Sequence, residues 1–345
     1  MDKLIIASIR PSSGKTNMTV GLMRASGKKF GYIKPFGERV LYRKKRLLDY
    51  DSALIKNIFE LDENPEEMSI GFDHSKLRYM YTEETVKEKL LEMEKNLEGD
   101  KELLVIEGGK DLTYGASVSL DPFSVAKYLG AKLVIVISGD DDSILDYLSF
   151  VKKYVRVNDV DIHGIIINKV KDLDDFRETY MDQIEEMGMD ILGIVPFERD
   201  LTYLSVEYIT DTLFAKVLAG EKGLNKKVKN IFVGAMSADQ AVRSPLFAKE
   251  GKLIITGGDR SDMIIGALES DTAAVVLTNN VLPPSNVISL AEEKGIPLLM
   301  VPTDTFRTAK QIDDMERLLT KNEKEKIDLL EKIVSENVDM EKLFK

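Results

Sequence analysis

The sequence predicts a doubly wound α/β protein, and two observations support this fold class. The first is a series of short apolar runs rich in Val, Ile and Leu. They do not alternate with polar residues, which is typical of strands buried on both faces of a parallel sheet. The second is that helical patterns lie between these runs, as alternating strands and helices require. The predicted strands of the first part are Leu4–Ile9, Leu103–Glu107, Lys132–Ser138, Gly164–Asn168 and Ile191–Val195, and the clearest predicted helices are Thr16–Ser26 and Thr82–Leu97.

The length predicts two domains, because 345 residues are roughly twice a typical ~150-residue domain. The polar, glycine-containing segment Ala219–Lys229 is the predicted linker. It separates a first domain over residues 1–218 from a smaller α/β domain over residues 226–320. A charged helix is expected over residues 321–345. The predicted strands of the second domain are Asn230–Val233, Lys252–Thr256, Ala273–Leu277 and Pro297–Val301.

The composition restricts the chemistry. The chain has no cysteine and two histidines, which excludes disulfides and thiolate chemistry and argues against a histidine-rich metal site. The net charge of −11 argues against a broad nucleic-acid footprint. No apolar stretch approaches the ~20 residues of a membrane span, and the amino terminus lacks a signal-peptide pattern. A cytoplasmic protein that works with lysines, carboxylates and Mg²⁺ is therefore expected.

The strongest motif is SIRPSSGKT at residues 8–16. It follows a predicted buried strand and opens a predicted helix, which is the context that a phosphate-binding loop needs. Backbone N–H groups at the helix start would bind phosphate oxygens, Lys15 would reach the β- and γ-phosphates, and Thr16 would hold Mg²⁺. The loop departs from the usual pattern because Ile9 stands five residues before Gly14, where a glycine is usual. The residues predicted to contact ATP here are Arg10, Ser12, Ser13, Gly14, Lys15, Thr16 and Asn17.

With this loop, the sequence resembles the dethiobiotin synthetase-like ATPases. That group is close to the cobyrinic acid diamide synthases and the partitioning ATPases, and it includes the amino-terminal region of long phosphotransacetylases. In partitioning-type members a signature lysine sits four residues before the second glycine of the loop, and Arg10 occupies that position here. Two interpretations of Arg10 stay open: a residue that acts across a dimer, and a surface loop residue.

Three further segments extend the resemblance: GYIKPFG at 31–37, DYDSAL at 49–54 and LLVIEGG at 103–109. The resemblance implies that Lys34 contacts the reacting group of the acceptor and the transferred phosphoryl group. It implies that Asp51, with Asp49 as the alternative, and Glu107 hold Mg²⁺ together with Thr16. Lys110 and Asp111 stand where the dethiobiotin branch has a longer glycine run, so the substrate contacts are expected to differ. The predicted catalytic residues are Lys15, Lys34, Asp51 and Glu107.

Two later positions are predicted to lie near the base. The strand at 164–168 resembles the one whose terminal asparagine reads adenine in this family, which implies that role for Asn168. An amide offers the donor and acceptor that a purine edge requires. The alternative is that Asn168 caps a turn between strand and loop. Pro196 and the segment after it resemble the loop that lines the base.

The second domain resembles the DRTGG domain, through Val233–Ser237, Ile254–Asp262 and Val276–Thr278. This resemblance implies dimerisation or ligand sensing. Thr256–Arg260 is predicted to be a turn that either binds an anion at exposed N–H groups or is closed by Asp259 as a helix N-cap. Together the two resemblances match the order at the front of long phosphotransacetylases. The chain ends before the transferase domain of those proteins, so acetyl transfer is not predicted.

The expected function is ATP- and Mg²⁺-dependent transfer of the γ-phosphoryl group to a carboxylate, a carbamate or water. The alternative is a regulatory protein that senses the nucleotide without useful chemistry, so enzyme activity stays open. The expected partners are an unknown small-molecule acceptor and a second copy of the chain, in a homodimer or higher oligomer. The basic run Arg39–Arg46 either attracts anions near the acceptor or is a solvated surface.

Overall fold

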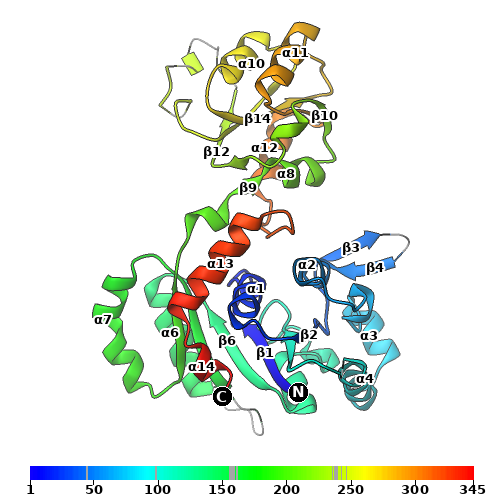
Figure 1. Cartoon of the computed structure of the whole chain (residues 1–345), viewed down its shortest axis with the longest axis vertical. Helices are drawn as coiled ribbons and strands as arrows, with labels where there is room; N and C mark the ends of the chain where they lie inside the picture. Colours follow the sequence, from blue (N-terminus) through cyan, green and yellow to red (C-terminus); the bar gives the residue numbers. More distant parts are fainter. Residues whose placement is uncertain are drawn as a thin grey trace. The chain divides into compact units, whose positions relative to one another are not determined.

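A computed structural model describes residues 1–43, 46–97, 99–154, 160, 162–234, 236, 240–241, 243–245 and 247–345. The chain folds into two compact units. The first unit contains Met1–Glu198 and Lys321–Lys345, and the second contains Arg199–Thr320 (Figure 1). Within the described residues, no helix is both long and apolar enough to cross a membrane.

The first unit is built on a six-stranded parallel sheet, which confirms the predicted fold class. The central strand β1 lies between β5 and β6, so the phosphate loop after β1 and Glu107 at the end of β5 reach the same edge of the sheet. The strands consist of apolar residues that are buried along most of their length, as the uninterrupted Val, Ile and Leu runs predict. Across the sheet the order is β2 (Phe30–Ile33), β5 (Leu103–Glu107), β1 (Asp2–Ser8), β6 (Lys132–Ile137), β7 (Ile162–Val170) and β8 (Ile191–Pro196).

Helices cover both faces of this sheet. Ile5 and Ala7 of β1 belong to a core that includes residues of α4, α5, α6 and α7, whereas α1 contacts β1 and β5 and also packs on α13. Thr82 caps α4 in a reciprocal capping box, as expected for a threonine before the first turn. A separate antiparallel hairpin, β3 (Val40–Arg43) and β4 (Arg46–Asp49), precedes α2. The helices are α1 (Lys15–Ser26), α2 (Tyr50–Phe59), α3 (His74–Met80), α4 (Glu83–Asn96), α5 (Pro122–Leu129), α6 (Asp141–Tyr154) and α7 (Leu173–Glu186), with short 3₁₀ turns at Pro65–Glu67 and Ala116–Val118.

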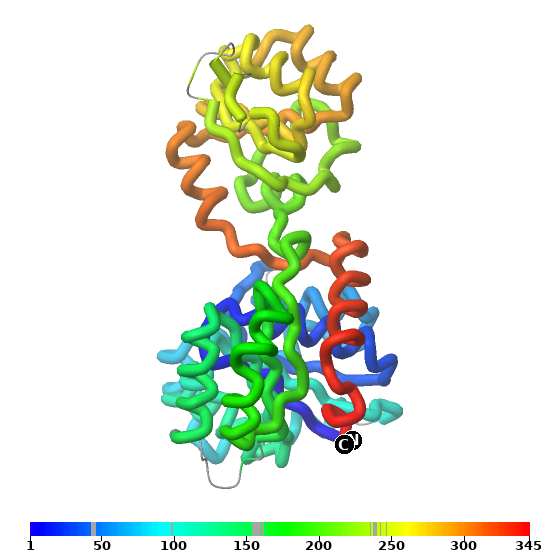
Figure 2. The backbone as a smooth tube through the Cα atoms, turned by 90° about the vertical axis from the view of Figure 1, so that its left-hand side faces the viewer, coloured from blue at the N-terminus to red at the C-terminus, as the bar shows by residue number. Residues whose placement is uncertain are grey.

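The carboxyl-terminal segment belongs to the first unit. Helix α13 (Lys324–Asn337) packs on α1 and β8, and α14 (Met340–Leu343) contacts β8 (Figure 2). A Cβ atom at Gly21 of α1 would lie 2.6 Å from Val334 Cγ2, so the two helices approach closely because position 21 has no side chain. Arg24 Nε also pairs with Glu331 Oε2 at 2.8 Å. The charged tail is therefore a structural part of the unit that carries the phosphate loop.

The second unit contains a five-stranded sheet in the order β10, β15, β14, β13, β12. The strands β12 to β15 are parallel, and β10 pairs with β15 in the antiparallel direction. The strands are β10 (Lys216–Ala219), β12 (Asn230–Val233), β13 (Lys252–Gly257), β14 (Thr272–Thr278) and β15 (Leu298–Met300), with a small pair β9 (Leu204–Ser205) and β11 (Lys227–Val228). The helices are α8 (Val206–Thr212), α10 (Ser261–Leu268), α11 (Ser285–Lys294) and α12 (Thr305–Asp313), with 3₁₀ turns at Arg199–Thr202 and Glu221–Gly223.

The units differ from the predicted domain boundaries. The expected linker, residues 219–229, lies inside the second unit, where it holds the end of β10 and all of β11. The chain passes between the units at Glu198–Arg199 and Thr320–Lys321 instead. The polar, glycine-containing composition of 219–229 reflects an edge strand and its turns, which have the same composition as a linker.

The turn after β13 excludes one of the two predictions made for Thr256–Arg260. The N-cap of α10 is Arg260, which makes no side-chain capping bond, so the prediction that Asp259 is the N-cap is wrong. The guanidinium group of Arg260 instead donates to the carbonyl oxygens of Gly234 at 3.2 Å and Met236 at 2.6 Å. Arg260 therefore ties the turn to the end of β12.

Candidate functional site

The phosphate loop joins β1 to α1 and has backbone conformations that its sequence explains. Gly14 is the N-cap of α1 with a φ of 93°, in the region that favours glycine. A Cβ atom at Gly14 would lie 2.5 Å from Asn168 Nδ2, so the site also requires glycine for space. Ser13 is buried, and its hydroxyl group donates to the carbonyl oxygen of Arg10 at 3.0 Å. The loop thus presents the start of a helix at the carboxyl edge of the sheet, where anions bind.

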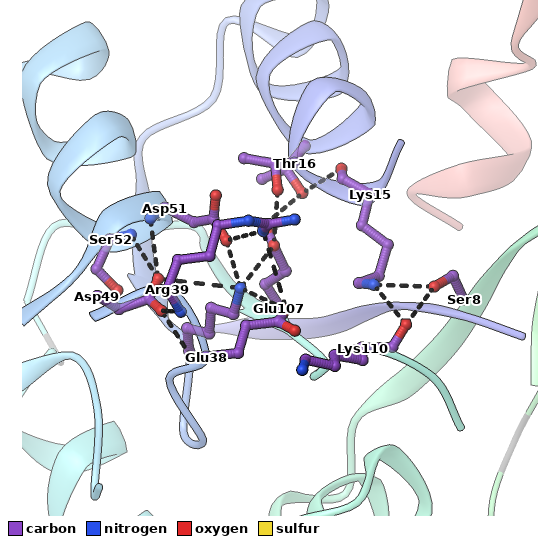
Figure 3. Close-up of polar contacts among 12 residues, drawn as sticks. Ser8, Lys15, Thr16, Glu38, Arg39, Asp49, Asp51, Ser52, Glu107 and Lys110 are labelled. Atoms are coloured by element: carbon purple, nitrogen blue, oxygen red, sulfur yellow. Dashed lines mark hydrogen bonds and ion pairs between the residues drawn. The ribbon is translucent and has the colours of Figure 1, made fainter. Parts of the chain in front are cut away.

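Lys15 lies in the first turn of α1 with its side chain buried. Its Nζ donates to Ser8 Oγ at 2.9 Å and to the carbonyl oxygen of Lys110 at 3.2 Å (Figure 3). Burial lowers the pKa of Lys15, and Glu107 opposes this effect only in part. Both hydrogen-bond acceptors of Lys15 are neutral oxygens. The positive charge of its ammonium group beside the loop is therefore not cancelled by a hydrogen-bonded carboxylate.

Lys34, which follows β2, is fully buried among carboxylates. Its Nζ donates to Asp51 Oδ2, to Glu38 Oε1 at 3.0 Å and to Glu107 Oε1 at 3.4 Å, and it lies 3.9 Å from Asp49 Oδ1. Burial lowers the pKa of Lys34, but the four carboxylates outweigh burial and hold its pKa well above the ordinary value. Lys34 is therefore the common cation of this cluster.

The two candidate aspartates have different surroundings. Asp49 caps α2: one carboxylate oxygen accepts from the N–H groups of Asp51 and Ser52, and the other accepts from those of Glu38 and Arg39. Burial raises the pKa of Asp49. Burial also raises the pKa of Asp51, but Lys34 and Arg39 outweigh it and lower that pKa. Since Asp49 is occupied by backbone donors, the geometry favours Asp51 as the ionised side chain that faces the site.

Glu107 connects the lysine cluster to the phosphate loop. Its Oε1 accepts from Thr16 Oγ1 at 2.9 Å, and its Oε2 accepts from Tyr32 OH at 3.2 Å and from Thr19 Oγ1 at 3.4 Å. Burial and Asp51 raise the pKa of Glu107, although Lys34 opposes them. Figure 3 shows how Asp51, Thr16 and Glu107 come together from α2, α1 and β5.

Tyr32 and Glu38 were not predicted from the sequence. The signal for Tyr32 was available, because it lies two residues before Lys34 and side chains two apart along an extended chain point to the same face. Glu38 directly follows the segment at residues 31–37, and nothing in the sequence indicates that its carboxylate faces Lys34. Tyr32 contacts Glu107 and Glu38 contacts Lys34, and both of these partners are predicted site residues.

Tyr32→Phe is expected to destabilise the protein by about 2 kcal/mol, since it removes a hydrogen bond to a buried carboxylate. Urea unfolding checks this. The matched control is Tyr128→Phe, which removes a tyrosine hydroxyl group from Glu83 at the surface, a bond of 2.7 Å. A Tyr32→Phe variant that is no less stable than Tyr128→Phe would contradict the role given to Tyr32.

The other predicted residues lie at different depths around the loop. Arg10 and Ser12 are exposed, and Asn17 is partly buried in the first turn of α1. Pro196 ends β8 and is partly buried, with Phe197 exposed after it. Asn168 is buried beside the loop, where its amide donates to the carbonyl oxygen of Ser13 at 2.8 Å. Asn168 therefore bonds to the phosphate loop and not to the turn that follows its own strand, as the alternative had it. The contact of Asn168 with adenine stays a prediction.

The basic run divides into two parts. Arg39 Nη1 pairs with Asp51 Oδ2 at 3.0 Å and so belongs to the site. Arg46 pairs with Glu66 at the surface. Lys44 and Lys45 lie outside the described residues. Arg39 thus belongs to the site, whereas Arg46 belongs to the surface.

The oxygen donors of the site suit a hard cation such as Mg²⁺. Thr16, Asp51 and Glu107 offer one hydroxyl and two carboxylate groups, which is the donor chemistry that Mg²⁺ prefers. Among the described residues, no group of three or more acidic or histidine side chains is arranged to hold a metal ion by itself.

A parallel sheet whose central strand leads through a Gly-Lys-Thr loop into a helix defines the class of P-loop nucleotide-binding domains. Comparison with known families agrees with this class. Residues 2–204 match the family model described as AAA domain, which is more than half of the chain, and the chain belongs to this family. Residues 208–315, within the second unit, match the DRTGG domain.

The curated relatives include phosphate acetyltransferases. The one from Pseudomonas aeruginosa is 22% identical over 368 residues, covering 99% of this chain and 51% of that protein. The chain thus spans about half the length of the curated relatives that it matches first. Among solved structures, the MinD cell division protein of Aquifex aeolicus is 17% identical with a TM-score of 0.35, covering 58% of this chain and 84% of that one. The CBS and DRTGG domains of the Clostridium perfringens pyrophosphatase, complexed with the activator diadenosine tetraphosphate, are 27% identical with a TM-score of 0.29, covering 33% of this chain and 47% of that one.

Proposed function

We propose that this protein binds ATP with Mg²⁺ and transfers the γ-phosphoryl group to a carboxylate, a carbamate or water. The observation that carries the proposal is the convergence of five side chains at one edge of the sheet. They come from α1, the residue after β2, α2 and the end of β5, and they are Lys15, Thr16, Lys34, Asp51 and Glu107. Phosphoryl transfer depends on positioning and on charge stabilisation, and these residues supply positive charge and oxygen ligands for both.

In this proposal each side chain has one task. Lys15 binds the β- and γ-phosphates, which takes its ammonium group away from the neutral oxygens that it contacts now. Thr16, Asp51 and Glu107 would hold Mg²⁺, which supplies charge neutralisation of the phosphate oxygens when bound. Lys34 faces the acceptor and stabilises the charge that develops on the transferred group. The acceptor oxygen forms a bond to the γ-phosphorus while the bond from phosphorus to the bridging oxygen breaks, and ADP leaves. A carboxylate or carbamate attacks as the anion, whereas water also releases a proton to the solvent.

A second candidate function is nucleotide sensing without turnover. The DRTGG domain and the similarity to half of the phosphate acetyltransferases favour it. Calorimetric titration with ATP, together with phosphate release measured with and without candidate carboxylates, tests both candidates. Turnover that stops in a chelator supports phosphoryl transfer, binding without turnover supports sensing, and no ATP binding contradicts both.

We also propose that the protein forms a homodimer when it binds ATP, because the exposed Arg10 occupies the position of the signature lysine in partitioning-type relatives. Sedimentation with and without ATP is expected to show a doubled mass in ATP. Arg10→Ala should weaken this association, since the variant loses the positive charge at the loop. An unchanged mass would contradict ATP-driven dimerisation.

A further inference from the structure

Two consecutive residues near the end of β7 contact the backbone of the phosphate loop. Asn168 Nδ2 donates to the carbonyl oxygen of Ser13 at 2.8 Å, and Lys169 Nζ donates to the carbonyl oxygen of Ser12 at 2.7 Å. A carbonyl oxygen only accepts hydrogen bonds, so the amide nitrogen of Asn168, and not its oxygen, must face the loop. These bonds join positions that are 155 and 157 residues apart in the sequence.

The backbone on both sides of this contact is unusual. Ser12 has a φ of 59° and Lys169 a φ of 66°, in the left-handed region that residues other than glycine seldom adopt. Such conformations persist where the surroundings hold them, and they gather at functional sites. Burial and the nearby charge of Arg10 lower the pKa of Lys169, so its ammonium group stays beside the loop at an electrostatic cost.

The direction of the two carbonyl groups has a consequence for the rest of the loop. The described chain has no cis peptide bond, and in a planar trans peptide the C=O and N–H groups point in opposite directions. With the carbonyl groups of Ser12 and Ser13 held toward β7, the N–H groups of Ser13 and Gly14 point away from it. Backbone N–H groups at this end of a helix are the groups that bind phosphate oxygens.

We propose that Asn168 and Lys169 are positioning residues that hold the phosphate loop in its anion-binding conformation before a ligand arrives. The inference rests on the proposed binding of ATP at this loop. In this proposal Asn168 supports the loop whether or not the ligand has a base. The predicted contact of Asn168 with adenine, in contrast, acts only on a ligand that has one. The two tasks differ in what they predict for a polyphosphate that has no base.

Calorimetric titration of the full chain with ATP and with inorganic tripolyphosphate, both with Mg²⁺, separates them. Lys169→Met keeps the apolar stem and loses the donor, and it is expected to weaken both ligands by about tenfold. Asn168→Ala is expected to do the same. The matched control is Lys152→Met, which removes another lysine bond to a backbone carbonyl oxygen, that of Glu186 at 3.3 Å. A loss confined to ATP, or no loss for either ligand, would overturn the proposal.

Hydrogen exchange of the ligand-free protein gives a second readout. The backbone amides of residues 8–10 and 12–16 should exchange faster in Lys169→Met than in the wild type, and Lys152→Met should match the wild type. Equal exchange in Lys169→Met and wild type would overturn the proposal even if binding changed. If the wild type bound neither ligand, the proposed function would fail, while the exchange rates would still decide whether these residues hold the loop.

Discussion

Lys34→Met is expected to lower the free energy of unfolding by about 3–5 kcal/mol, because it removes one partner from a buried charge cluster. Lys34 is fully buried, and its ammonium group contacts Asp51, Glu38 and Glu107. Methionine fills a similar volume but leaves these carboxylates without their common cation. Urea unfolding at neutral pH measures the effect.

The matched control is Lys326→Met, which removes another buried lysine of the same unit, one that pairs with Glu323 at 2.6 Å. We expect this control to lose less stability, because Glu323 is less deeply buried than the carboxylates around Lys34. Equal losses in the two variants would contradict the central role of Lys34 in the cluster.

The pH dependence of the Lys34→Met variant has a definite sign. In the wild type the pKa of Asp51 is lowered despite burial, so Asp51 contributes stability that is lost as the pH falls through its folded-state pKa. Burial already raises the pKa values of Asp49 and Glu107 in the wild type, and Lys34 opposes this effect. Without Lys34 these two pKa values rise further, whereas Arg39 still opposes burial at Asp51. The folded variant then binds protons more readily, so its stability should rise from about pH 8 to about pH 5. If the difference in free energy of unfolding between the variant and the wild type stayed constant over this range, this account would be contradicted.

Local patterns in the sequence predicted most of the fold. Leu103–Glu107 and Asn230–Val233 became strands with the predicted bounds. The first is buried on both faces, as its uninterrupted apolar run predicts, whereas the second lies at the edge of its sheet with Ile231 and Val233 exposed. The domain boundary and the place of the tail were not predictable in this way. The contact between Gly21 and Val334 joins residues more than 300 positions apart, and no local pattern encodes which surface a charged amphipathic helix will cover.

For the site, the sequence predicted which residues lie near the phosphate loop but not which side chains contact them. Lys15 and Thr16 begin α1 after the central strand, and Glu107 ends β5, so their place at the edge of the sheet follows from the fold class. Asp51, in α2, was predicted from the family resemblance alone. The partners of these residues were not predictable, since Glu38 and Tyr32 reach the cluster through side-chain directions that only the folded chain fixes. The distinction between Asp49 and Asp51 likewise depends on the backbone of α2, which gives Asp49 its N–H donors.

Lys15→Met is expected to reduce phosphate release from ATP by about 10²–10³-fold, which is the cost of removing one preorganised group that stabilises charge in a transition state. The same substitution should leave stability within about 1 kcal/mol of the wild type, because the hydrogen bonds of Lys15 go to neutral oxygens and a modest net energy is lost with them. The two buried lysines are thus expected to respond differently to substitution: Lys34→Met should mainly lower stability, whereas Lys15→Met should mainly lower phosphate release. Phosphate release and urea unfolding, measured on the same preparations, test this contrast.

The result for Lys15→Met also separates the two candidate functions. If the wild type turns over ATP and the variant binds it weakly without turnover, the site is catalytic. If the wild type binds ATP and does not release phosphate with any carboxylate, carbamate or water as acceptor, loss of binding in Lys15→Met supports a sensor. Turnover that is unchanged in a folded Lys15→Met variant would contradict the assignment of the phosphate loop itself, because no other lysine of the described chain lies in the first turn of α1.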